Sequence, residues 1–130
     1  MTAGDPGTTL EIVSPVTKER PTMELHDVSY FFGGAFLANA VPHFVSGAMG
    51  RPFQSPFARP PGKGLSSATV NVLWGFANFV VAYFLIVRVG DFDLRATGNI
   101  VAAGLGVLLM GIMAAHAFGR FHGGNMPDGS

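Results

Sequence analysis

Five polar side chains that could bind a ligand or move a proton lie within otherwise apolar stretches of the sequence. They are Asn39, His43, Asn71, Asn78 and His116. In a membrane, a histidine can titrate, ligate a metal or form a hydrogen bond with a quinone, so polar residues in such stretches indicate a candidate binding site. His43 and His116 could together hold a haem if their helices ran side by side.

Polar residues at these positions also have a structural interpretation. Asparagine and histidine commonly join transmembrane helices through interhelical hydrogen bonds worth about 1 kcal/mol each. We favour this role for the five residues and keep two alternatives, a quinone or small-molecule pocket and a bis-histidine haem site. We therefore expect no metal site, and no cofactor other than the haem or quinone of those alternatives.

Three stretches without a formal charge must position these side chains. They cover residues 28–50, 64–87 and 96–119, which are 23, 24 and 24 residues long. A helix rises about 1.5 Å per residue and needs roughly 20 residues to cross a hydrocarbon core about 30 Å thick. The sequence therefore predicts an all-α integral membrane protein with three transmembrane helices, at about residues 28–49, 67–87 and 98–118.

The composition supports a membrane location. Only 12% of the 130 residues are charged and 48% are hydrophobic, whereas about 25% are charged in a typical soluble domain. A chain of this size could not bury three uncharged helices on all faces and still present a polar surface to water. The formal net charge is zero, so no basic field favours a nucleic-acid partner. The absence of cysteine excludes disulfides and thiolate metal sites.

The predicted membrane domain covers residues 28–119 and is flanked by two tails. Residues 1–27 are rich in Pro, Thr and Gly and predict a mobile N-terminal tail, while residues 120–130 predict a short C-terminal one. The first helix is the weakest of the three because it contains glycines, polar residues and Pro42. Proline cannot complete the helical hydrogen-bond pattern, so we expect this span to be kinked or re-entrant.

Small residues indicate how the helices pack. Asn71, Gly75, Asn78 and Ala82 form one narrow stripe, which should face inward and meet Asn39 and His43, with Gly75 allowing close approach of the backbones. The third helix carries two rows of small residues spaced four apart, which suit helix contacts within the chain or between copies. These rows are Gly98, Ala102 and Gly106, then Gly111, Ala115 and Gly119.

The first loop contains four prolines, which favour an extended path. We expect Phe53 and Phe57 to lie at the level of the lipid headgroups, with Arg51, Arg59 and Lys63 on phosphates. The alternative is a loop packed over the helix ends. The positive-inside rule gives a tie of four cations on each side, with a lean that places this loop in the cytoplasm because its cations are concentrated in one short segment.

Two residue pairs near the helix ends complete the prediction for the loops. Ser66 and Ser67 are natural N-caps for the second helix. Asp91 and Asp93 in the second loop could suggest acid–base chemistry or a metal, but a solvated connector between two helices fits them better.

Catalytic patterns are missing from the sequence. No predicted span contains Asp or Glu, which removes the usual proton-coupling group of a transporter, and neither a serine–histidine–acid set nor an HExxH pair is present. We therefore expect a non-enzymatic small membrane protein that acts through helix packing, as a homo-oligomer or as an accessory subunit of a larger membrane complex. The alternatives are the ligand-binding unit described above and a small oligomeric pore or transporter lined by the asparagine stripe.

Three segments carry a resemblance to a known group of proteins. They read NAVPHFVSGAMGRPF (39–53), SPFARPPGKGLSS (55–67) and VNVLWGFANF (70–79). This series resembles a family of small, uncharacterised bacterial integral membrane proteins over about residues 30–120. The resemblance implies a multi-pass protein of the bacterial inner membrane, and it implies no activity.

Overall fold

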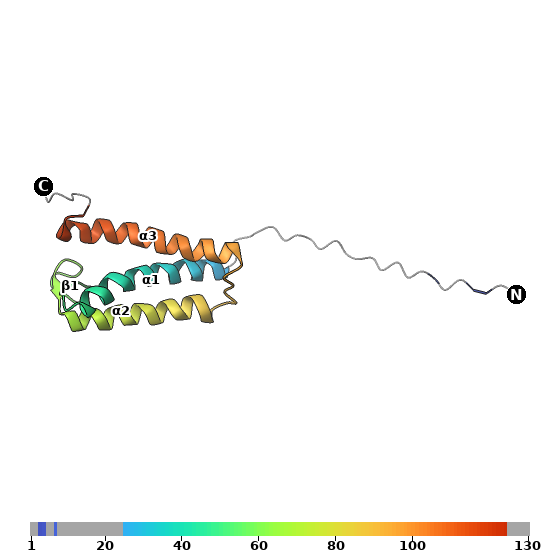
Figure 1. Cartoon of the computed structure of the whole chain (residues 1–130), viewed down its shortest axis with the longest axis horizontal. Coiled ribbons are helices and arrows are strands. Elements are labelled where there is room, and N and C mark those ends of the chain that lie inside the picture. The colour runs from blue at the N-terminus through green and yellow to red at the C-terminus, as the bar shows by residue number, and fades with distance from the viewer. Residues whose placement is uncertain (1–2, 5–6, 8–24, 125–130) are drawn as a thin grey trace.

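The computed structural model describes residues 3–4, 7 and 25–124 and contains three long helices (Figure 1). They are α1 (Leu25–Ala48), α2 (Ala68–Tyr83), which continues as the π-helical turn η1 (Phe84–Arg88), and α3 (Thr97–His122). Each is long and apolar enough to cross a membrane, with mean hydropathy values of 1.2, 2.0 and 2.1. This confirms the predicted all-α, three-span architecture.

The predicted tails fall largely outside the described residues. Most of residues 1–27, and residues 125–130 of the predicted C-terminal tail, belong to that part of the chain. The helices extend somewhat beyond their predicted limits, since α1 begins at Leu25 and α3 continues to His122.

Helix α1 is one continuous helix with Pro42 inside it. Its 24 residues correspond to about 36 Å, which is enough to cross the hydrocarbon core in a single passage. A continuous helix of this length favours a full crossing over the re-entrant alternative.

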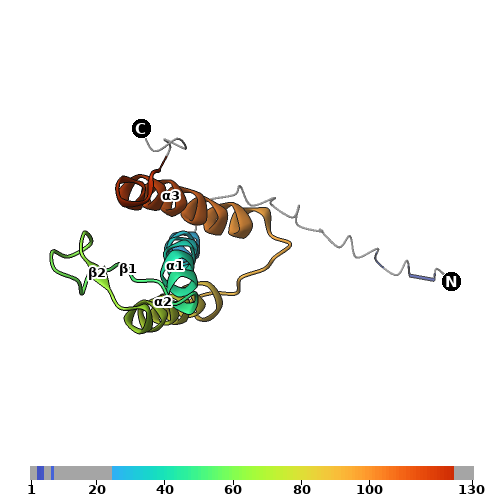
Figure 2. The same ribbon diagram turned by 60° about the vertical axis from the view of Figure 1, so that its left-hand side comes forward.

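Helix α1 lies between α2 and α3, which have few contacts with each other (Figures 1 and 2). Glycines allow both close approaches. A Cβ atom on Gly34 would overlap the Ala103 carbonyl of α3, and one on Gly106 would overlap the Phe31 carbonyl of α1. On the other side of α1, a Cβ on Gly47 would come within 2.7 Å of the Val72 backbone nitrogen. Backbone atoms cannot give way as flexible side chains can, so glycine is required for this spacing.

The first loop contains a short hairpin that an all-α prediction did not include. Strand β1 (Phe53–Gln54) pairs antiparallel with β2 (Leu65–Ser66). Directly after β2, the Ser67 hydroxyl accepts a hydrogen bond from the Val70 N–H at 3.2 Å, which confirms Ser67 as the N-cap of α2.

The second loop closes the other end of the bundle. The Ser29 hydroxyl donates to the Leu85 carbonyl at 2.6 Å, in the final turns of α2 and η1, where carbonyls have no helical partner. The ring of Tyr30 meets that of Phe92 edge-on at 5.0 Å. Asp93 accepts from the Arg95 N–H at 2.8 Å, a local turn contact that fits the connector interpretation.

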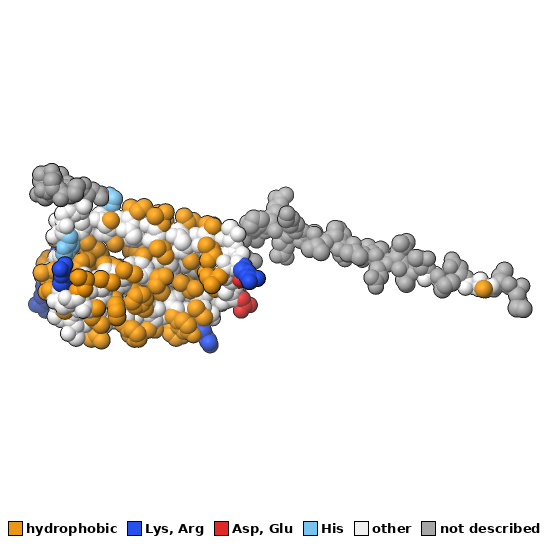
Figure 3. All heavy atoms as spheres, viewed as in Figure 1, with side chains coloured by type: hydrophobic (Ala, Val, Ile, Leu, Met, Phe, Trp, Pro, Cys, Tyr) orange, Lys and Arg blue, Asp and Glu red, His pale blue; other side chains and the backbone are white. Residues whose placement is uncertain are grey.

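Charge is confined to the two ends of the bundle, and apolar side chains cover the surface between them (Figure 3). At the end formed by the first loop and the C-terminus of α3, residues 49–67 and 119–124 contain no carboxylate. We call this the basic end; its cations are Arg51, Arg59, Lys63 and Arg120. The opposite end carries Asp27, Asp91 and Asp93 together with Arg88 and Arg95.

Candidate functional site

The polar stripe of α2 faces α1, as predicted. All four of its members, Asn71, Gly75, Asn78 and Ala82, are buried. A Cβ on Gly75 would lie 2.6 Å from the Phe44 backbone nitrogen, so the glycine allows the two helices to touch there.

Two side-chain pairs connect α1 and α2 across this stripe. The Asn39 amide donates to Asn78 Oδ1 at 3.0 Å, and the Asn78 amide donates to the Trp74 carbonyl at 2.8 Å. His43 Nδ1 lies 2.9 Å from Asn71 Oδ1. We call the four residues Asn39, His43, Asn71 and Asn78 the polar junction.

Asn71 is the centre of the polar junction because it connects three parts of the chain. Its amide nitrogen lies within hydrogen-bond distance of three carbonyls, which share its two N–H groups. They are those of Phe53, Ser66 and Ser67, at 3.1, 3.2 and 3.0 Å. With the amide nitrogen directed at carbonyls, Asn71 Oδ1 must be an acceptor, so His43 donates from Nδ1. One side chain therefore joins α1, the start of α2 and the β1 strand.

Aromatic rings cover His43 toward the basic end. Phe53 meets its ring edge-on at 5.4 Å and Phe118 of α3 does so at 5.7 Å. His122 stacks on Phe53 at 5.2 Å with an interplanar angle of 7°, and its Nε2 donates to the buried Gln54 side chain at 2.9 Å. The first loop and the end of α3 therefore contact each other, and together they cover the polar junction.

His116 does not belong to this cluster. It lies on the exposed surface of α3, and its Nδ1 bonds to the Ile112 carbonyl of its own helix at 3.0 Å. The prediction placed His116 beside His43 by depth alone, but a helix also has faces. Phe118, two positions on and therefore rotated by about 200°, makes the contact with His43 instead. The geometry gives no support to a haem held between His43 and His116.

The two aromatic residues of the first loop, predicted to lie at the level of the lipid headgroups, differ in their surroundings. Phe53 is 8% exposed and packs over the helix ends, so for this residue the alternative interpretation was correct. Phe57 is 64% exposed and meets Trp74 edge-on at 5.2 Å. The three cations of the loop, Arg51, Arg59 and Lys63, are exposed at the basic end, where phosphates could reach them.

Of the two small-residue rows on α3, only the first has a member packed closely against another helix of the described chain. Gly106 is buried against α1, whereas a Cβ on Gly98 or Gly111 would meet nothing within 4 Å. Gly111, Ala115 and Gly119 instead line an open groove of about 610 Å³ between α1 and α3.

Four residues of this region were not identified as functional candidates from the sequence: Gln54, Ser55, Phe118 and His122. Ser55 forms a hydrogen bond with Ser66 across the hairpin. A signal was present for one pair, because Phe118 and His122 are four residues apart and so share a helix face. Which loop residues they meet depends on the hairpin, which the proline-rich sequence did not predict.

Most polar groups of the polar junction are engaged within the chain. Its amides and the Nδ1 atom of His43 are bonded to one another or to backbone carbonyls. In residues 25–124, no three His, Asp or Glu side chains come together in a way that could hold a metal ion. One buried side-chain nitrogen of the described chain, Nε1 of Trp74, has no hydrogen-bond partner. This arrangement can join helices, and it offers no evident chemistry.

Comparison with known proteins adds no assignment. None of the protein-family models, curated proteins or solved structures compared with the chain matches it. The three-helix architecture and the surfaces it leaves uncovered are therefore the features from which a function can be inferred.

Proposed function

We propose that this chain is a non-enzymatic protein of the bacterial inner membrane that acts through helix packing, as a homo-oligomer or as an accessory subunit of a larger membrane complex. The observation that carries the proposal is the exposure of α3. Only one residue of this 26-residue helix, Gly106, is buried within the chain. Most of its other residues are exposed, and the few inward contacts, such as that of Phe118 with His43, leave a long surface available to other helices.

The outward face of α3 has a spacing that suits a second helix. Six exposed or half-exposed residues on it alternate by four and three positions, the pattern that brings two helices together at a small crossing angle. All are apolar or small, so backbones and side chains could interdigitate. We call them the α3 seam: Val101, Leu105, Leu108, Ile112, Ala115 and Gly119.

The polar junction supports a packing role over the pore alternative. Asn71 and Asn78 are 0% and 1% exposed and lie between α1 and α2. A path for ions or solutes would need these amides on an accessible face. Their position favours a structural role, in which interhelical hydrogen bonds hold the weakly apolar α1 in place.

Site-directed crosslinking tests this proposal cleanly because the chain contains no cysteine. Leu108→Cys and Ile112→Cys each place a single thiol on the α3 seam, to which a photocrosslinker can be attached in native membranes. A homo-oligomer gives adducts of twice the 13.6 kDa chain mass. An accessory subunit gives one reproducible adduct of a different mass.

Met113→Cys is the matched control, since Met113 is 64% exposed on α3 but lies off the seam. The proposal requires adducts from the two seam positions and few from position 113. It is refuted if all three positions yield only the unlinked chain, or if position 113 crosslinks as well as the seam does.

A further inference from the structure

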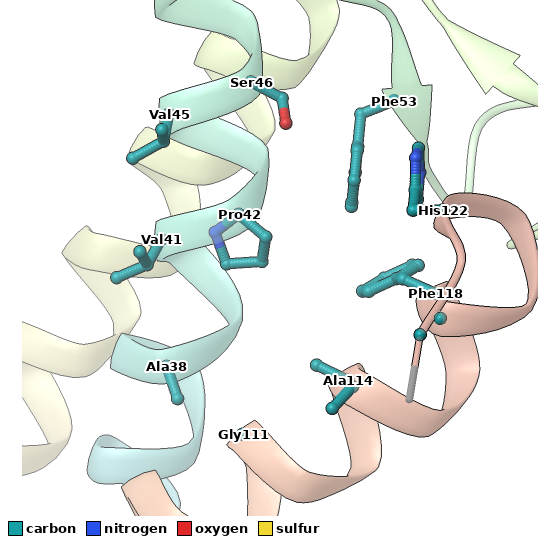
Figure 4. A pocket seen from close by; sticks show the side chains of 13 residues that line it. Ala38, Val41, Pro42, Val45, Ser46, Phe53, Gly111, Ala114, Phe118 and His122 are labelled. Atoms are coloured by element: carbon teal, nitrogen blue, oxygen red, sulfur yellow. The ribbon is translucent and has the colours of Figure 1, made fainter. Parts of the chain in front are cut away.

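The groove between α1 and α3 results from the packing of these two helices. They touch closely where Gly34 meets Ala103 and Gly106 meets Phe31. Nearer the basic end, the rings of Phe53 and Phe118, 4.8 Å apart, lie at the head of the space between the helices (Figure 4). Small side chains such as Gly111 fill little of that space, which leaves about 610 Å³.

The chemistry of the lining suits hydrocarbon. Figure 4 shows Ala38 and Ala114 bordering the lower part of the groove, with Pro42 and Phe118 above them on its two sides. The polar groups that line it, the Ser46 hydroxyl and the His122 ring, both lie toward the basic end. The volume falls within the roughly 300–1,000 Å³ typical of ligand pockets. An empty apolar groove of this size would lose dispersion contacts on all its walls, whereas acyl chains are present around any membrane-spanning helix.

Phe53, at the head of the groove, belongs to the loop that carries Arg51, Arg59 and Lys63. The backbone N–H of Arg51 donates to the carbonyl of Ser46, a residue of the groove wall, at 2.8 Å, so Arg51 follows directly on this wall. Arg59 and Lys63 of the same loop are exposed at this end, whereas Arg120 lies on the other side of α3, where it lines a separate hollow with Met113 and His116. No carboxylate lies in residues 49–67 or 119–124 to neutralise these charges.

We propose that this groove binds an acyl chain of an anionic phospholipid whose phosphate lies at the basic end. Charge selects the lipid, because each Lys or Arg near the surface attracts an anionic headgroup appreciably. A second helix is a less suitable occupant, since the Phe53, Phe118 and His122 rings obstruct the head of the groove. The inference depends on the three-span architecture. Ala115 and Gly119 belong both to the groove wall and to the α3 seam, so a bound acyl chain and a second helix would compete at these two positions.

Native mass spectrometry of the full chain in mild detergent tests the proposal. Equal amounts of phosphatidylglycerol and phosphatidylethanolamine with identical acyl chains are added, and the lipid-bound species are compared. We expect phosphatidylglycerol to be retained in preference. Arg51→Gln should reduce that preference about fivefold, whereas Arg120→Gln, on the other side of α3, should leave it unchanged. Both side chains are exposed, so both variants should keep the fold intact.

A steric pair of variants locates the lipid. Gly111→Phe projects a ring into the groove and should abolish lipid retention. Met113→Phe adds a ring at an exposed position on the opposite side of α3 and should behave as the unaltered chain. The proposal is overturned if Gly111→Phe retains lipid normally, if the unaltered chain retains both lipids equally, or if a second copy of the chain replaces lipid in the groove. The two arginine variants keep the test decisive should Gly111→Phe fail to fold.

Discussion

Replacing Asn71 with alanine should strongly destabilise the packing of α1 on α2. The substitution removes two buried hydrogen bonds. In one, Asn71 Oδ1 accepts from His43, and in the other the Asn71 amide donates to the Phe53 carbonyl. Interhelical hydrogen bonds in membranes average about 0.6 kcal/mol and reach about 1.7. A buried polar group left without a partner costs about 1–3 kcal/mol. Together these terms predict a loss of about 2–4 kcal/mol.

The chain supplies its own reporter for this measurement. Trp74 is the only tryptophan and lies one turn from Asn71, with its ring 6.4 Å from His43 and 5.2 Å from Phe57. Reversible unfolding in mixed micelles with increasing SDS, followed by Trp74 fluorescence and far-ultraviolet circular dichroism, gives the free energy of unfolding. Agreement between the two signals shows that α2 unpacks and unfolds together.

Two further variants separate hydrogen bonding from packing. Leu73→Ala truncates a side chain on α2 that is 63% exposed, so it should cost under about 1 kcal/mol. Asn71→Leu keeps a large side chain but removes the bonds, and should remain nearly as unstable as Asn71→Ala. If Asn71→Ala falls within about 0.5 kcal/mol of Leu73→Ala, the polar junction does not stabilise the bundle and our account of it is wrong.

Three other predictions follow from the same contacts. Gly106→Ala should lower the free energy of unfolding by about 1–3 kcal/mol, because the new Cβ would overlap the α1 backbone. Gly111→Ala lies in open space, so it should leave this free energy unchanged or raise it by up to about 1 kcal/mol; unfolding in mixed micelles measures both. A double-mutant cycle with Asn39→Ala and Asn78→Ala should give a coupling of about 0.6 kcal/mol, and zero coupling would contradict the bond. With the basic end in the cytoplasm, Lys63→Cys in intact cells should react with a membrane-impermeant thiol reagent only after permeabilisation.

The sequence predicted the helices and the α1–α2 interface well because both depend on local spacing. Charge-free length determines which segments can cross a membrane, and helical periodicity determines which residues share a face. Asn71 and Asn78 are seven residues apart on α2, and Asn39 and His43 are four apart on α1. The polar groups of each pair find hydrogen-bond partners within the membrane when the two helix faces meet.

What the sequence could not predict depends on contacts between distant segments. The pairing of Phe53 with Ser66 depends on how the proline-rich loop folds back. Depth within the membrane could not decide whether His116 or Phe118 would face His43, because that depends on the rotation of α3 about its axis. The rotation is determined by Gly106, whose contact with Phe31 turns Phe118 inward and leaves His116 outside.

The distribution of polar groups also bears on how the bundle forms. Helix α1 has the lowest mean hydropathy of the three helices, yet it lies at the centre and contacts both others. Its Asn39 and His43 find their partners on α2, so α1 becomes compatible with lipid only once α2 is beside it. Helix α3 contacts α1 through Gly106 and the Phe118 ring, and Gly106 is the one residue of α3 that is buried, so we expect the α1–α2 pair to form without α3. Deleting α3 should therefore leave the Asn71–His43 contact intact, while deleting α2 should prevent α1 from remaining in the membrane.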